Sequence, residues 1–142
     1  MTIQRAIEIV GGVAILGYPV GTGRELVAAM RDGLSVRTVE QLIASGRLSA
    51  SEVDSVVLPR KTLSHRRKIG TLTPDQSDRL MRAARVIAAA EETFGSQTKA
   101  AAWLRRPTTA LEGDTPLSLL DTSEGVLMVE DLLARIGHGL AA

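Results

Sequence analysis

The chain has 142 residues, with 17 Lys and Arg against 16 Asp and Glu, a formal net charge of +1 and no cysteine. This length allows one domain or two small ones, and the missing cysteine excludes both a disulfide framework and a thiolate metal site. No apolar run approaches the length that spans a membrane. Aromatic residues make up only 2% of the chain, so stacking platforms for single-stranded nucleic acid are not expected.

Residues 1–32 show no clean hydrophobic period and hold five glycines between positions 11 and 23. We expect a partly ordered leader with one short helix around residues 24–31. Two glycines and a glutamate interrupt the apolar start, so we expect no secretion signal and a cytoplasmic protein. The glycines lack the spacing of a phosphate-binding loop, and nucleotide binding is not expected here.

Residues 33–87 have the pattern of a helix-turn-helix region. A first helix begins after Ser35 and ends at Gly46. The motif Ser49-Ala50-Ser51-Glu52 fits a capping box that begins a second helix. Leu58-Pro59 ends that helix, because the residue before a proline is disfavoured in the α conformation. The apolar stripes are Val36, Val39, Leu42 and Ile43 in the first helix and Val53, Val56 and Val57 in the second.

The third helix of this region is strongly basic. Residues 59–68 read PRKTLSHRRK, with five positive charges and no negative one, and Gly70 follows as the expected C-cap. Because five of the 17 basic residues lie here, the rest of the chain has 12 basic against 16 acidic residues, a net charge of −4. The short helix that begins after Ser49, a tight turn and this basic helix together outline a helix-turn-helix motif that binds double-stranded DNA. A solvated charged helix face is the alternative for a charge run alone.

Helical geometry places Leu63 on the inner face of the basic helix and most polar side chains on the outer face. The polar residues between positions 61 and 65 suit base edges, and the arginines suit phosphates or guanine. Because helix-turn-helix proteins usually read paired half-sites, we expect a homodimer on a near-palindromic site. The predicted DNA-binding residues are Arg60, Lys61, Thr62, Ser64, His65, Arg66, Arg67 and Lys68.

The rest of the chain continues the all-α pattern, and nothing in it predicts a sheet. Thr73-Pro74-Asp75-Gln76 combines an N-cap, a first-turn proline and a capping-box glutamine at the start of a long helix that ends at Gly95. Further helices follow from Ser96, from Thr115-Pro116 and from about residue 122 to residue 137. The expected core positions include Leu80, Ala83, Ala84, Ile87, Ala90, Phe94, Trp103, Leu117, Leu119, Leu120, Val126, Val129, Leu132, Leu133 and Ile136.

A set of short motifs occurs in order from residue 60 to residue 139. They are Arg60-Lys61-Thr62-Leu63, Arg66-Arg67-Lys68, Ser77-Asp78-Arg79-Leu80, Ala84-Arg85-Val86, Phe94-Gly95, Ala102-Trp103-Leu104, Ala110-Leu111, Gly113, Thr115-Pro116-Leu117, Leu120-Asp121-Thr122, Gly125, Val129, Leu132-Leu133, Arg135-Ile136 and Gly139. In these motifs the chain resembles the Xre-type antitoxins encoded beside RES-domain toxins, a family that includes the MbcA and ParS antitoxins. Ser96, Thr108 and Glu112 depart from that family's pattern.

The resemblance implies an all-α protein with a helix-turn-helix region at residues 33–87 and a small helical toxin-binding domain at residues 88–142. It implies a RES-domain toxin partner that consumes NAD and is blocked at its active site, and repression of the antitoxin's own promoter by the complex. NAD would belong to the partner, and the antitoxin would be no enzyme and would need no cofactor. In agreement, His65 and His138 have neither a nucleophile partner nor the spacing of a helical zinc site.

The extreme C-terminus is the predicted inhibitory element. The apolar period ends after Ile136, two glycines flank His138, and the remaining segment is small and nearly uncharged apart from its terminal carboxylate. Given the resemblance, we expect this segment to enter a narrow cleft beside the toxin's active site; a frayed terminus is the alternative. The predicted toxin-binding residues are Arg135, His138, Gly139, Leu140, Ala141 and Ala142.

Two other functions are compatible with the pattern. A stand-alone dimeric transcription regulator would use its C-terminal helices for dimerisation or for a small effector. A helical adaptor without DNA contact would leave the five clustered charges unexplained. The neighbouring gene distinguishes the first two, because an antitoxin gene should lie next to a RES-domain toxin gene.

Overall fold

The computed structural model describes residues 2–139, and in this range the protein is all-α, as the sequence predicts. A single antiparallel bridge between Ser35 and Thr71 is the one β-type pairing among these residues. None of the helices in this range is long and apolar enough to cross a membrane.

The helices are α1 (Thr2–Ile9), α2 (Gly12–Leu16), α3 (Gly23–Asp32), α4 (Arg37–Ala44), α5 (Ala50–Val56), α6 (Arg60–Ile69), α7 (Pro74–Phe94), α8 (Gln97–Leu104) and α9 (Ser123–Gly137), with 3-10 turns η1 (Thr109–Leu111) and η2 (Leu117–Leu119).

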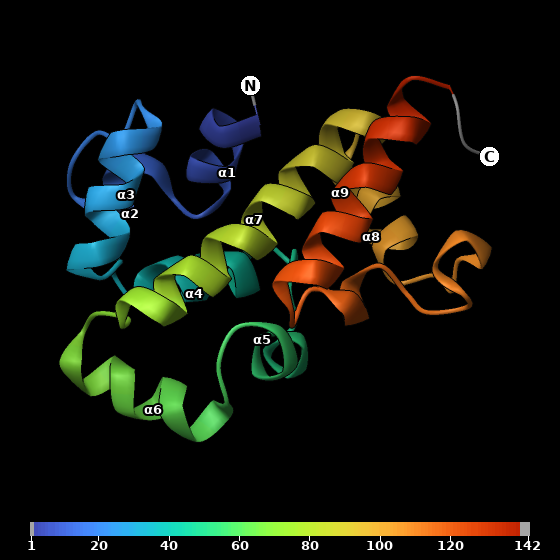
Figure 1. Ribbon diagram of the computed structural model, residues 1–142. Helices are drawn as coiled ribbons and strands as arrows, with labels where there is room; N and C mark the ends of the chain where they lie inside the picture. The colour runs from blue at the N-terminus through green and yellow to red at the C-terminus, as the bar shows by residue number, and fades with distance from the viewer. Residues whose placement is uncertain (1, 140–142) are drawn as a thin grey trace.

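The long helix α7 is the central element of the fold. It packs against α1, α3, α5, α8 and α9, and Figure 1 shows it running between the N-terminal helices on the left and the C-terminal helices on the right. Its start is the predicted one, since Thr73 and Gln76 form a capping box, Pro74 stands at the first helical position and Gly95 is the C-cap. Of the predicted stripe, Leu80, Ala83, Ala84, Ile87 and Ala90 are buried, and Phe94 is half-buried.

Residues 2–32 are more helical than the sequence predicts. The expected short helix is α3, but α1 and α2 precede it. Helix α1 buries Ala6, Ile7 and Ile9 and packs along α7, so the expectation of one short helix was wrong. The glycines that obscured the period cap these short helices, because Gly11 and Gly17 adopt left-handed φ values of 116° and 88° on either side of α2.

The helix-turn-helix elements follow the local signals. Ser49 and Glu52 form both halves of the predicted capping box of α5, and α5 ends before Pro59. Gly70 caps α6 with a φ of 101°. The bridge between Ser35 and Thr71 joins the start of α4 to the residue that follows the α6 cap, so the unit closes on itself. The side chains of Val53, Val56, Val57 and Leu63 lie in the core.

The C-terminal helices pack on the second half of α7. Trp103 of α8 is buried and lies against Phe94, with ring centroids 5.3 Å apart. The first turn of α9 approaches η2 so closely that a Cβ at Gly125 would collide with the backbone carbonyl of Leu119. Gly125 is therefore the residue that allows α9 to begin at this point, directly beside η2.

Candidate functional site

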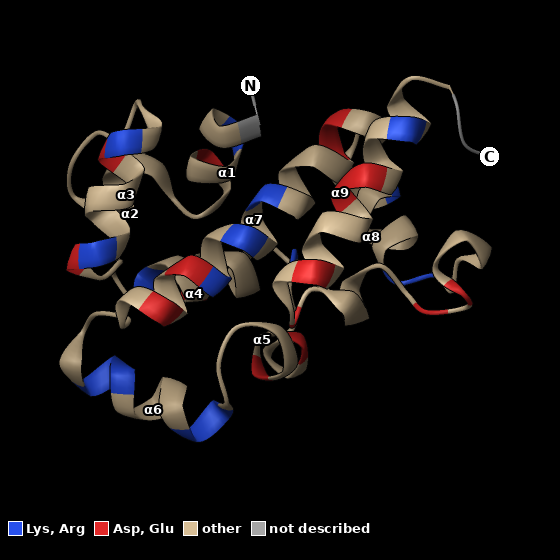
Figure 2. Ribbon diagram, viewed as in Figure 1, with Lys and Arg blue, Asp and Glu red and all other residues tan. Residues whose placement is uncertain are grey.

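Helix α6 presents its basic side chains at one edge of the molecule. In Figure 2 the basic segments lie towards both ends of this helix, which sits apart from α9 at the lower edge. Leu63 is buried, as predicted, and the N–H of Arg60 at the helix start donates to Asp54 Oδ1 over 2.7 Å. Of the predicted DNA-binding residues, Thr62 and Arg66 are half-buried and the others are exposed, namely Arg60, Lys61, Ser64, His65, Arg67 and Lys68.

Two of the five clustered cations also bind within the protein. Arg66 donates from Nε to the carbonyl oxygen of Thr71 over 2.7 Å, and Arg67 Nε lies 2.8 Å from Glu40 Oε1. Within residues 2–139, Arg60, Lys61 and Lys68 have no partner for their side-chain charge. The geometry therefore leaves these three cations free to meet phosphates, while Arg66 and Arg67 also hold α6 in place.

Of the predicted toxin-binding residues, Arg135 lies in the last turn of α9, and His138 and Gly139 follow that helix directly, away from α6 (Figure 1). Arg135 pairs with Asp131 on the same helix, with 3.4 Å between Nε and Oδ2. His138 is exposed and borders a hollow of about 620 Å³ between α7 and α9. Gly139 closes the described range, and Leu140, Ala141 and Ala142 lie outside the described residues. The role of this segment stays a prediction.

A buried ion-pair cluster joins segments far apart in the chain. Glu91 of α7 is buried and accepts from Arg47 of the α4–α5 loop at 2.7 Å and 3.0 Å. Arg5 of α1 reaches the same carboxylate at 3.2 Å. This cluster was not predicted from the sequence. The available signal was the position of Glu91, four residues after Ile87 on the apolar stripe of α7, because a charge there is seldom buried unless it is paired.

A second ion pair joins α8 to the start of α5. Arg105 binds the Glu52 carboxylate with two hydrogen bonds of 2.7 Å and 2.8 Å, and it also donates to the carbonyl of Arg47. Burial alone would raise the pKa of Glu52, but the hydrogen bonds from Arg105 and from the N–H of Ser49 outweigh it and leave this pKa below its ordinary value. The carboxylate that caps α5 is therefore also the anchor of Arg105.

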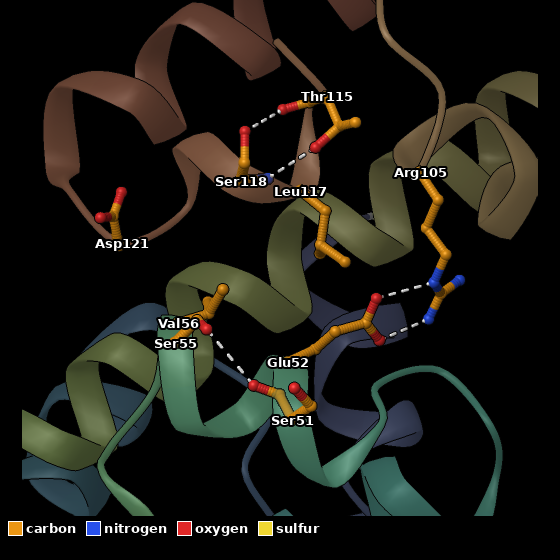
Figure 3. A pocket seen from close by; sticks show the side chains of 9 residues that line it. All are labelled: Ser51, Glu52, Ser55, Val56, Arg105, Thr115, Leu117, Ser118 and Asp121. Carbon is orange, nitrogen blue, oxygen red and sulfur yellow. Dashed lines mark hydrogen bonds and ion pairs between the residues drawn. The ribbon is translucent and has the colours of Figure 1, made fainter.

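A cleft of about 540 Å³ lies beside this pair, between α5 and the segment that contains η2. Figure 3 shows Arg105 and Glu52 at one end of it and hydroxyl side chains on both sides. The hydroxyls of Ser55 and Ser118 donate to backbone carbonyls of their own segments. The pair of Arg105 and Glu52 is therefore a polar contact that joins the two sides of this cleft.

Neither histidine lies in a site with recognisable chemistry. His65 is exposed on α6 and His138 follows α9. Among residues 2–139, no three His, Cys, Asp or Glu side chains lie close enough together to hold a metal ion. The remaining candidates among the described residues are the basic side chains of α6 and the residues at the end of α9.

Comparison with known proteins matches two consecutive domains to the chain. Residues 25–85 match the antitoxin Xre-like helix-turn-helix domain, and residues 89–139 match the antitoxin Xre/MbcA/ParS C-terminal toxin-binding domain. The first match begins within α3, earlier than the predicted boundary at residue 33, and α7 extends through both matches.

Similar whole proteins carry the same description. Antitoxin Xre of Pseudomonas putida is 35% identical over 128 residues, which cover 89% of this chain and 80% of the relative. Antitoxin Xre of Yersinia enterocolitica is 34% identical over 128 residues, covering 88% and 86%. A Sphingobium protein named Prs ADP-ribosylating antitoxin is 28% identical over 132 residues, covering 82% and 80%. The chain therefore belongs to the Xre family of antitoxins, which pair a helix-turn-helix domain with a C-terminal toxin-binding domain.

Proposed function

We propose that this antitoxin binds a RES-domain toxin that consumes NAD, blocks the toxin's active site and, with the toxin bound, represses its own operon. The observation that carries the proposal is that the basic helix α6 and the C-terminal domain at residues 89–139 are joined in one packed fold. Helix α7 belongs to both matched domains, and the pairs Arg47–Glu91 and Arg105–Glu52 tie the loop before α5 and the start of α5 to the C-terminal half. A toxin bound at the C-terminal half is thereby held in a fixed relation to α6.

The NAD-consuming partner is supported by one relative in particular. The Sphingobium relative is named Prs ADP-ribosylating antitoxin. ADP-ribosyl transfer uses NAD as the donor, so a toxin with this chemistry would deplete or divert NAD. In this proposal the cofactor belongs to the toxin, and the antitoxin is a cytoplasmic binding protein that catalyses no reaction.

DNA binding in this proposal rests on α6. Three unpaired cations there would contact phosphates of promoter DNA, and the polar side chains between Lys61 and His65 would contact base edges. Because helix-turn-helix proteins usually bind paired half-sites, two copies of the chain would sit on one near-palindromic operator within a larger toxin–antitoxin complex.

The test is co-expression with the RES-domain protein encoded next to this gene. Cells that express the toxin alone should stop growing and lose NAD, and the antitoxin should restore both growth and NAD while it co-purifies with the toxin. An antitoxin that neither co-purifies with the toxin nor restores NAD would contradict the proposal. The complex should also bind promoter DNA with an affinity that falls steeply as salt rises.

The inhibitory tail has a separate test. Removal of residues 139–142 should free the NAD-consuming activity while the complex still forms, since most of the contact area would come from the preceding helices. The physical reason is that a segment of small and nearly uncharged side chains can enter a narrow cleft beside the toxin's active site. If the truncated protein protects cells fully, inhibition works through the helices instead.

A further inference from the structure

The toxin-binding domain exposes one adjacent pair of large apolar side chains. Within the described part of the match at residues 89–139, the exposed large hydrophobic residues are Leu127 and Met128, at 57% and 49% of their full surface. Both lie on α9, one after the other. Single exposed apolar residues are ordinary on protein surfaces, but an adjacent pair forms a small apolar patch that a partner protein can contact.

The pair is not needed for the packing of α9. The inner face of this helix buries Val126, Val129, Leu132 and Leu133, and the helix packs on α7. At 100° per residue, Leu127 and Met128 lie on the opposite face. The protein thus has an apolar face on α9 beyond the one that its own core uses.

Acidic side chains surround this outer face. Helical spacing places Glu124 one turn before the pair and Asp131 one turn after it. Asp131 is paired with Arg135, but Asp121 and Glu124 have no ion-pair partner among residues 2–139. In Figure 2 acidic segments mark the start and middle of α9, and a basic segment appears near its end. A complementary partner would offer an apolar hollow with basic residues at its rim.

The same charges disfavour a second copy of the chain on this face. In an antiparallel pairing of two α9 helices centred on Leu127 and Met128, Glu124 of one copy would stand opposite Asp131 of the other. In a parallel pairing, Glu124 would meet its own equivalent. Both arrangements bring like charges together, which costs free energy at an interface.

We propose that Leu127 and Met128 on the outer face of α9 are the anchor by which this antitoxin docks on its toxin. This inference rests on the proposed function, because it takes the RES-domain toxin as the occupant. It separates two roles: the outer face of α9 supplies affinity, and the C-terminal segment supplies inhibition. Anchors of this kind are a few large side chains that fill a hollow in the partner.

The test compares Leu127→Ala/Met128→Ala with wild type in binding to the purified toxin. The variant should keep the helical content and melting temperature of wild type, because both side chains are exposed. Its Kd for the toxin should rise about 30-fold or more, the change that loss of an interface anchor produces. Val13→Ala/Val27→Ala is the matched control, with exposures of 58% and 41% and positions outside residues 89–139, and it should bind the toxin as wild type does.

A second variant tests the acidic rim. Glu124→Lys should slow association with the toxin, and the difference from wild type should shrink as salt rises, because rim charges act mainly on the association rate. Deletion of residues 139–142 should show the opposite pattern to the alanine pair, with toxin activity freed and binding kept.

Three other outcomes of these experiments would contradict the inference, the proposed function or both. If wild type binds the toxin and the alanine pair binds equally well, the anchor lies elsewhere and the proposed function stands. If the alanine pair instead abolishes self-association in sedimentation while toxin affinity is unchanged, the face joins two copies and the inference is wrong. If wild type itself does not bind the RES-domain toxin, both the proposed function and this inference fail.

Discussion

Replacement of Trp103 by alanine should destabilise the C-terminal half of the protein. Trp103 is 5% exposed and packs on Phe94 with ring centroids 5.3 Å apart. Truncation of a buried tryptophan to alanine costs about 3–5 kcal/mol, because it removes buried apolar area and leaves a cavity. A domain of ordinary stability has about 5–15 kcal/mol in total, so about a fifth of it or more would be lost. For a chain of this size the melting temperature should fall by roughly 10–15 °C.

Circular dichroism is the suitable assay, because the substitution removes the only tryptophan of the chain and with it the intrinsic fluorescence signal. Tyr18→Ala is the matched control, since Tyr18 is an exposed aromatic residue and should change the melting temperature little. A destabilised C-terminal half should also release the toxin at temperatures where wild type holds it. If Trp103→Ala melts within about 2 °C of wild type, the burial argument is refuted and Trp103 would have to act as a surface contact.

Two further predictions concern charged residues. Replacement of Arg66 and Arg67 by alanine should weaken binding to promoter DNA and lower its salt slope by about one for each lost phosphate contact. Circular dichroism should show an intact fold, because the exposed pair of Arg67 and Glu40 contributes at most about 1 kcal/mol and the hydrogen bond from Arg66 to the carbonyl of Thr71 about 1–2 kcal/mol. The folded pKa of Glu52 lies below its ordinary value of 4.5, so the stability that its pairing with Arg105 adds is full above that pH and is lost as the pH falls through the folded pKa. Melting temperatures between pH 7 and pH 3 should therefore fall less for Glu52→Gln than for wild type, and equal slopes would contradict this assignment.

Much of the fold was predictable because its signals are local. Capping boxes at Ser49 and Thr73, the proline at position 59 and the cap at Gly70 each act within a few residues, and the structure confirms all of them. Helix α1 was missed for the opposite reason. It has only 8 residues, is followed by two glycines, and buries its apolar side chains against α7, which follows much later in the chain. Such a short helix is marginal by itself and depends on tertiary packing.

The features of the candidate sites also differ in whether their signals are local in the sequence. The charge cluster on α6 could be found from the sequence, because five basic residues lie within ten positions. The sequence could not show which of these basic residues are paired within the protein, since the partner of Arg67 is Glu40, 27 residues earlier. The exposed pair on α9 was also missed: Leu127 and Met128 lie in an apolar run whose other members are buried, and hydrophobic period alone does not show which face remains open.

The junction between the two halves has a physical consequence for the antitoxin. Glu91 is buried with Arg47, and separation of the halves would leave its carboxylate without that partner. A shift that takes Arg47 away while Glu91 stays buried costs up to about 3–5 kcal/mol, because only Arg5 then balances the desolvated carboxylate. Movement of α6 relative to the C-terminal helices is therefore opposed by a buried charge as well as by apolar packing on α7. A toxin docked on the outer face of α9 would consequently occupy one defined position relative to α6. If α6 binds the promoter as proposed, the shape of the toxin would decide whether a second complex fits beside the first.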